Sequence, residues 1–152
     1  MKFVQLLLVT SIALASFCKE PGIDLEIIRA NYQKAISNKK LCQTMIENLN
    51  SDNDKDSVKL AYLGAFQTIW AKHTINPLSK FATFKKGKKN IEEAVKLDPK
   101  NLEIRIIRLS VQTNCPSFLG YRNSIEEDKR MIQSQNKNIV SVYLKKMISD
   151  LI

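Results

Sequence analysis

The sequence predicts an all-α fold, a stack of about seven helices arranged as hairpins. Apolar residues recur three and four positions apart along most of the chain, which is the spacing of one helix face. No stretch alternates apolar and polar residues for long enough to form a strand. Glycine occupies only 4 of 152 positions, which disfavours a β fold built on tight turns.

Three helices are expected in the first half of the chain. Asp24 can cap a helix over 24–38, whose apolar residues lie along one side. A second helix is expected over 40–49, followed by a polar loop. A third, over 56–74, is the most apolar of the set and should therefore lie at the centre of the fold.

The fourth helix is expected over 77–97. Asn76 can cap it, and Pro77 suits the first helical position because its missing N–H would have no partner there. Phe81 and Phe84 are expected on its inward stripe. Gly87 lies on the same stripe, and a glycine inside a helix costs about 1 kcal/mol relative to alanine. We therefore expect another helix to approach it closely.

Three more helices complete the prediction. The segment 100–113 is apolar on most sides, which indicates helices on more than one face. An aromatic loop over 118–121 follows it. Ser124 and Glu127 have the spacing of a capping box, in which each side chain bonds the other residue's backbone N–H, and a helix should run from there to 135. The last helix is expected over 139–151.

The N-terminus has the pattern of a secretory signal peptide. Lys2 provides a positive charge, and the apolar run after it ends in Ala-Leu-Ala at 13–15, the motif that signal peptidase recognises. The run is shorter than the roughly 20 residues of a membrane-spanning helix. We therefore expect cleavage after Ala15, export to the periplasm or cell envelope, and a single helical domain over 24–152. A buried N-terminal helix is the alternative.

Cys18 introduces a second alternative for the N-terminus. A lipoprotein signal ends with a small residue directly before a cysteine that becomes acylated. The segment 14–18 has this shape, except that Phe17 stands where a small residue is expected. In this alternative the signal extends to residue 17, and a lipid on Cys18 anchors the protein to the membrane.

Two further cysteines, Cys42 and Cys115, lie inside the predicted domain. Export permits a disulfide between them, which would tie an early helix to a later turn. The alternative is a pair of small, buried, apolar thiols. The chain has no C-x-x-C pair and one histidine, so neither a zinc nor a haem site is expected, and no cofactor.

One segment carries a family pattern. Gly87, Ile91, Ala94 and Pro99 have the spacing of the second helix of a tetratricopeptide hairpin, and Leu-Asp-Pro-x-Asn at 97–101 is the usual exit from such a helix. The segment resembles the tetratricopeptide family. The resemblance implies a right-handed α-α superhelix that binds a protein or peptide. The helix over 56–74 is the expected partner of this segment.

A longer pattern also resembles a known group. It comprises Tyr-Leu-Gly-Ala at 62–65, Trp-Ala-Lys-His at 70–73, Asn-Pro-Leu at 76–78 and Pro-Ser-Phe-Leu-Gly-Tyr at 116–121. These motifs resemble a group of small exported proteins of Bacteroidota that has no assigned activity. The resemblance implies export and a helical fold, and it transfers no catalytic residue.

Arg105 and Arg108 stand three apart on one face of an otherwise apolar helix, so their charged ends need carboxylate partners. The candidates are Glu92, Glu93, Glu126 and Glu127. One interpretation is a partly buried ion pair that fixes helix packing, which predicts that Arg105→Ala lowers thermal stability. The other is a site for an anion or a partner's carboxylate, with Trp70, His73 and Tyr121 beside the two arginines.

Two weaker candidates concern metal binding and catalysis. Asp52, Asp54 and Asp56 recur at alternate positions, as in a calcium loop, but Ser57 and Leu63 stand where such a loop needs glycine and glutamate. A solvated loop that caps a helix is expected instead, without a metal. His73 is the only histidine, and no serine or cysteine lies at a telling spacing from it. A hydrolase is therefore the least favoured function.

The chain carries a net charge of +9, and one helix is strongly basic on its outer side, at Lys80, Lys85, Lys86, Lys88 and Lys89. The face is either simply solvated or contacts an acidic partner. Export disfavours nucleic acid as that partner. We therefore expect an exported, non-enzymatic scaffold that binds a protein or peptide. The alternative is a lipid-anchored envelope protein with a structural or assembly role.

Overall fold

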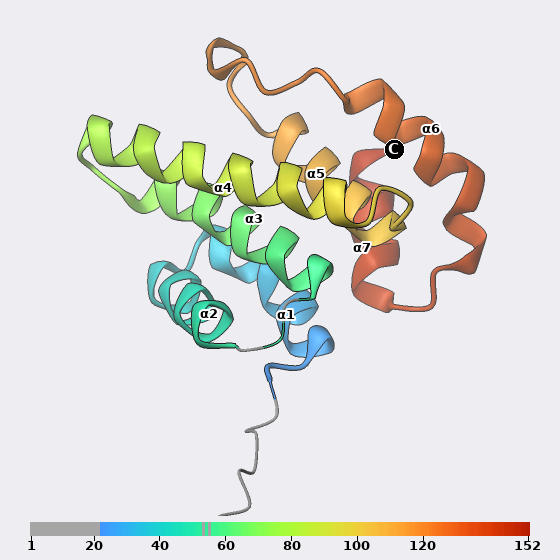
Figure 1. The fold of residues 1–152 in the computed structure, drawn as a ribbon, viewed down its shortest axis with the longest axis horizontal. Coiled ribbons are helices and arrows are strands. Elements are labelled where there is room, and N and C mark those ends of the chain that lie inside the picture. Colours follow the sequence, from blue (N-terminus) through green and yellow to red (C-terminus); the bar gives the residue numbers. More distant parts are fainter. Residues whose placement is uncertain (1–21, 53, 55) are drawn as a thin grey trace, which may run out of the picture.

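The computed structural model describes residues 22–152 apart from 53 and 55. This part of the chain forms seven α-helices and no strand, which confirms the all-α prediction (Figure 1). The helices are α1 (Leu25–Tyr32), α2 (Lys39–Ser51), α3 (Ser57–His73), α4 (Pro77–Leu97), α5 (Leu102–Thr113), α6 (Ile125–Gln135) and α7 (Val142–Leu151). Three 3₁₀ turns accompany them: η1 (Lys34–Ile36), η2 (Ser117–Leu119) and η3 (Asn136–Asn138).

The predictions for the N-terminus concern residues that the structure does not describe. The signal peptide, its cleavage after Ala15 and the lipid site at Cys18 lie outside the described residues. Among the helices that the structure does describe, none is both long and apolar enough to span a bilayer.

Side-chain caps start α1, α3 and α4 where they were predicted, whereas α5 begins at Leu102, two residues after its predicted start. Asp24 accepts a hydrogen bond from the backbone N–H of Glu26, and Asp56, Asn76 and Asn101 cap α3, α4 and α5 in the same way. Each cap satisfies N–H groups that have no partner within the helix. These short polar residues therefore determine where the helices begin.

The predicted capping box at Ser124 is wrong. The Ser124 side chain makes no cap hydrogen bond, and its backbone is not extended as a capping residue normally is. Glu127 bonds Arg105 with its carboxylate instead of the Ser124 backbone. Glu127 therefore takes part in an ion pair with Arg105 and not in the predicted capping box with Ser124.

Two predicted boundaries also differ. The first predicted helix is divided, because α1 ends at Tyr32 and the chain continues in the tighter turn η1. The last helix begins at Val142 instead of 139, since Ile139 is in an extended conformation. Val140 is 86% exposed and so makes little packing contact that would hold it in a helix.

The antiparallel pair α3 and α4 forms the centre of the molecule, and the two helices run side by side over most of their length (Figure 1). Helix α2 lies on the other side of α3, and α5 packs against both members of the pair and against α6 and α7. Gly64 of α3 and Gly87 of α4 meet backbone to backbone. The expectation that another helix approaches Gly87 is confirmed. The tetratricopeptide-like superhelix stays a prediction.

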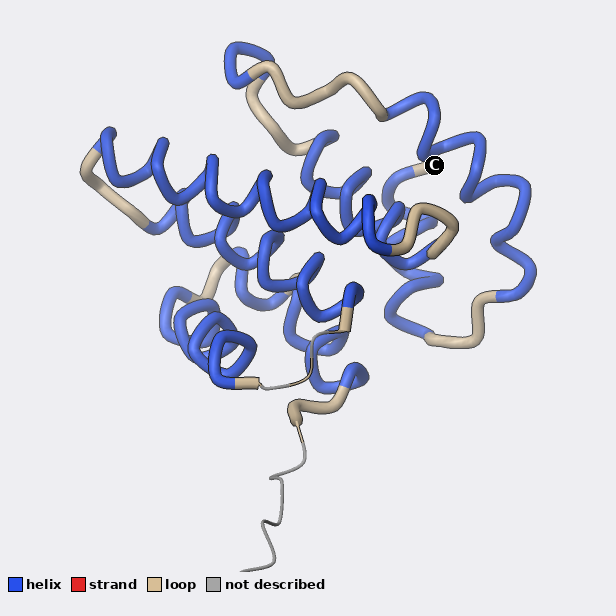
Figure 2. The backbone as a smooth tube through the Cα atoms, viewed as in Figure 1, coloured by secondary structure: helices blue, strands red, loops and turns tan. Residues whose placement is uncertain are grey.

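The expected inward stripe of α4 is only partly correct. Phe84 is buried at 7% exposure, but Phe81 is 53% exposed and Leu78 is 82% exposed. The first turns of α4 pack on α3 from one side, while their other side faces the long connection between α5 and α6 (Figure 2). A hollow lined by Pro77, Lys80 and Phe81 lies beside this part of α4.

Candidate functional site

An apolar groove lies between the first turns of α4, the C-terminal parts of α3 and α5, and η2. Its volume is about 470 Å³, within the range of roughly 300–1,000 Å³ that ligand sites occupy. Aromatic and aliphatic side chains from all four segments line it: Ile69, Phe81, Phe84, Val111, Phe118 and Leu119. The groove is therefore large enough to hold several apolar side chains or a small ligand.

The floor and the rim of the groove differ in exposure. Ile69, Phe84 and Val111 on the floor are buried, and they belong to the core. Phe118 and Phe81 form the rim, and they are 84% and 53% exposed. Large apolar side chains that stay in water around an apolar hollow are typical of an interaction site.

The polar groups on the floor are bonded within the protein. The Tyr32 hydroxyl lies 3.3 Å from Ser110 Oγ, and the Asn114 side-chain amide donates to the Ser110 carbonyl. Burial raises the pKa of Tyr32 to about 12, so this phenol is neutral at physiological pH. The groove therefore offers mainly apolar contact to an occupant.

The charged residues that line the groove are both lysines, Lys72 on α3 and Lys80 on α4. The basic face of α4 begins beside them. The Lys85 ammonium lies 5.9 Å from the centre of the Phe81 ring, which is within the range of a cation–π contact. Positive charge therefore accompanies the apolar rim.

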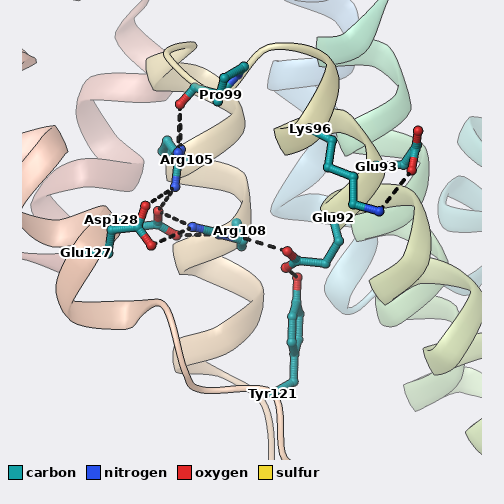
Figure 3. A network of polar contacts seen from close by, with 9 residues as sticks. All are labelled: Glu92, Glu93, Lys96, Pro99, Arg105, Arg108, Tyr121, Glu127 and Asp128. Carbon is teal, nitrogen blue, oxygen red and sulfur yellow. Dashed lines mark hydrogen bonds and ion pairs between the residues drawn. The ribbon is translucent and has the colours of Figure 1, made fainter.

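A buried ion-pair network joins α4, α5 and α6 outside the groove lining (Figure 3). Asp128 of α6 is fully buried and accepts two hydrogen bonds from Arg108, at Nε and Nη2, each 2.7 Å long. It also accepts one from Arg105 Nη1 at 3.0 Å. Arg105 donates in addition to the Pro99 carbonyl and to Glu127.

This network accounts for the arginine pair that the sequence singled out. Three carboxylates, from Glu92, Glu127 and Asp128, surround the two guanidinium groups. Because negative charges outnumber positive ones here, the cluster has no spare positive charge to attract an anion. Asp128 was not among the predicted partners, although it follows Glu127 directly. Glu93, which was, pairs with Lys96.

The network also includes Tyr121, which packs against Phe84, a residue that lines the groove. The Tyr121 hydroxyl donates a 2.7 Å hydrogen bond to Glu92, whose other carboxylate oxygen accepts from Arg108 (Figure 3). The Tyr121 ring meets Phe84 edge-on, and the Lys88 ammonium lies 4.8 Å from its centre. Burial, with the Glu92 carboxylate beside it, raises the pKa of the Tyr121 phenol. Tyr121 thus holds the loop that carries Phe118.

The structure does not place Trp70 and His73 with the arginine pair. Their rings lie 6.1 Å apart near the end of α3, and the Lys39 ammonium lies over Trp70. His73 Nε2 is 2.9 Å from the Ala35 carbonyl oxygen, so this nitrogen donates to the backbone of η1. Of the five predicted residues, only the two arginines and Tyr121 share one cluster.

The aspartates between α2 and α3 bond other groups of the same chain. Asp56 caps α3, while the Asp52 and Asp54 carboxylates pair with the Lys59 ammonium at 2.9 and 3.1 Å. Among the described residues, no group of three or more potential metal ligands is close enough to hold an ion. The expected cap at Asp56 is confirmed, whereas the Asp52 side chain is only 4% exposed and is therefore not solvated as expected.

The two cysteines inside the domain are free and buried. The disulfide alternative is therefore not what the structure contains. Cys42 Sγ lies 3.4 Å from the Phe66 carbonyl in the core, whereas Cys115 lines the groove, so each thiol has its own apolar surroundings. Burial raises the pKa of Cys42 to about 12.

Comparison with protein-family models, curated proteins and solved structures gives no match for this chain. The groove itself was not predicted. The aromatic loop over 118–121 was the available signal, because exposed aromatic residues on a loop indicate contact with a partner. The helical spacing of Phe81 and Phe84 predicts that both face the core. Spacing alone cannot show which part of that helix face is covered by neighbouring segments.

Proposed function

We propose that the protein is an exported, non-enzymatic interaction module that binds an apolar segment of a protein or peptide partner in the groove. The observation that carries the proposal is the exposed aromatic rim, Phe81 and Phe118, around an apolar hollow of about 470 Å³. Burying such side chains is favourable by roughly 1.5–3 kcal/mol each, which is the usual driving force of association. The rim residues are therefore the expected anchors.

The chemistry of the lining supports binding over catalysis. The hydrogen-bond neighbour of Ser110 Oγ is the Tyr32 phenol, whose pKa is raised by burial, so it stays protonated and cannot act as a general base for the serine. Burial raises the pKa of the Cys115 thiol, which keeps it in the weakly nucleophilic protonated form. His73 bonds a backbone carbonyl outside the lining.

Site-specific photo-cross-linking in the producing cell tests the proposal. A photoreactive amino acid replaces Phe118, and in a control strain it replaces Val142, which is 75% exposed on α7 and belongs to no part of the groove lining. We expect a defined protein adduct from position 118 and none from 142. Phe81→Asp should abolish the adduct, and the identified partner should bind the purified protein directly.

Two results would contradict the proposal: equal labelling from both positions, or no adduct from position 118. Intact mass of the same sample decides between the two expected N-termini. Cleavage after Ala15 gives a free chain, and acylated Cys18 identifies the membrane-anchored alternative.

A further inference from the structure

We propose that the occupant of the groove is an acidic amphipathic helix of another protein, with its apolar side chains in the groove and its carboxylates against the lysines. This inference rests on the proposed function, because it names the kind of segment that the groove binds. Charge, backbone chemistry and the extent of the apolar rim each support it.

The charges around the groove favour a negative occupant. Lys72 and Lys80 are its charged lining residues, and no carboxylate lines it. Among the described residues, no aspartate or glutamate forms an ion pair with either lysine. Lys85 stands over the ring of Phe81, which lines the groove. Such a surface attracts acidic partners and repels basic ones.

The backbone of the occupant should be helical. An extended peptide lying in the groove would bury N–H and C=O groups among mainly apolar side chains, where few polar groups could bond them. The described part of the chain is all helix and loop, so it offers no strand edge to which a peptide could add. A helix satisfies its own backbone and presents apolar residues along one side.

The apolar surface extends beyond the hollow itself. Leu78 is 82% exposed one turn before Phe81, and Phe118 is 84% exposed on the opposite rim. A small amphiphile could fill the hollow and contact Phe118, but Leu78, which does not line the hollow, would stay in water. A helix of about three turns, roughly 16 Å long, would cover the hollow and the rim together.

Binding of three synthetic peptides to the purified full chain tests the inference by fluorescence anisotropy. The first is a helix of about 18 residues with leucine on one face and glutamate on the other. The second carries lysine in place of glutamate, and the third has the composition of the first in an order without an apolar face. We expect the first to bind about tenfold more tightly than either of the others, and the difference to shrink in high salt.

Two groove variants and one remote variant locate the site. Phe118→Asp should weaken binding of the acidic helix about tenfold, because it places a carboxylate on the apolar rim. Lys80→Glu should weaken it about fivefold at low salt and less at high salt. Lys146→Glu, an exposed charge reversal on α7, should leave the affinity within about twofold. All three residues are exposed, and thermal melts confirm that the variants fold.

The outcomes separate the inference from the proposed function. Equal or tighter binding of the lysine peptide overturns the charge argument while the groove still binds a helix. Absence of peptide binding, with the Phe118 cross-link retained, overturns the helical occupant and leaves the interaction module in place. Saturable binding of a long-chain fatty acid that depends on Lys80, with no peptide binding and no cross-link, overturns both.

Discussion

Gly64 and Gly87 face each other where α3 crosses α4, and a β-carbon built on either residue would lie 2.5 Å from the carbonyl oxygen of the other. The obstacle on each side is backbone, which cannot rotate away as a flexible side chain can. The two glycines therefore permit the distance at which the central helix pair packs. The same crossing fixes α4 relative to α3, two of the helices that border the groove.

Gly87→Ala should destabilise the protein. A mid-helix glycine-to-alanine change normally gains about 1 kcal/mol, but here the added methyl group forces the helices apart and should lower the free energy of unfolding by about 1–3 kcal/mol. Urea denaturation measures the difference. Ala82→Gly at an exposed position of α4 is the control for helix propensity and should cost about 1 kcal/mol. A stabilised Gly87→Ala variant would show that the close approach is absent.

Asp128→Ala should be among the most damaging substitutions. It leaves Arg105 and Arg108 without their shared buried carboxylate, and breaking a buried pair in this way costs about 3–5 kcal/mol. Arg105→Ala should also lower the melting temperature. Glu127→Ala is the matched control, since its carboxylate is 58% exposed and its loss should cost about 0–1 kcal/mol. Similar melting temperatures for the Asp128 and Glu127 variants would exclude a structural role for the network.

Tyr121→Phe should loosen the loop that carries Phe118. The change removes only the hydroxyl that bonds the Glu92 carboxylate, a charged hydrogen bond worth about 1.5–3 kcal/mol. We expect a lower melting temperature and a weaker cross-link from position 118, because the loop that carries Phe118 loses its tether. Tyr143→Phe, at a 42% exposed site on α7, should change neither measurement. An unchanged cross-link in Tyr121→Phe would separate the network from the groove.

The thiols of Cys42 and Cys115 should resist alkylation in the native protein. Both are buried, and burial raises the pKa of each, so little reactive thiolate forms at neutral pH. Iodoacetamide followed by peptide mass mapping should modify both residues only after denaturation, without a reducing agent. Modification that required reduction first would instead reveal a disulfide.

Acid should destabilise the protein partly through Asp52. The hydrogen bond from Lys59, followed by that from the backbone N–H of residue 54, lowers the pKa of this carboxyl. A lowered folded-state pKa contributes stability that is complete above the unfolded value of about 3.9 and is lost as pH falls through the folded value. Melting temperatures below about pH 4 should therefore fall less steeply in Asp52→Asn than in the unchanged protein. Asp150→Asn, which keeps Asp52, should retain the original slope.

Local chemistry made most of the helix boundaries predictable. Asn76 and Pro77 start α4 where their backbone preferences require it, because a cap and a first-turn proline depend on neighbouring residues alone. Gly87 predicted a close helix contact, because a glycine lowers the stability of a helix unless another helix packs closely against it. The sequence by itself therefore determined the all-α class, the order of the helices and one central contact.

Only the tertiary structure decided what the polar and aromatic residues do. Glu127 bonds Arg105 and not its predicted capping partner, and Asp128 lies buried at the centre of the network. Such ion pairs join groups that are far apart in the sequence, so local sequence patterns do not reveal them. Phe81 and Phe84 share one helical stripe, yet only Phe84 is covered, since Phe81 borders the open groove between α4 and the connection that follows α5. Helical periodicity identifies a face of a helix, and the neighbours present in three dimensions determine whether that face is core or groove.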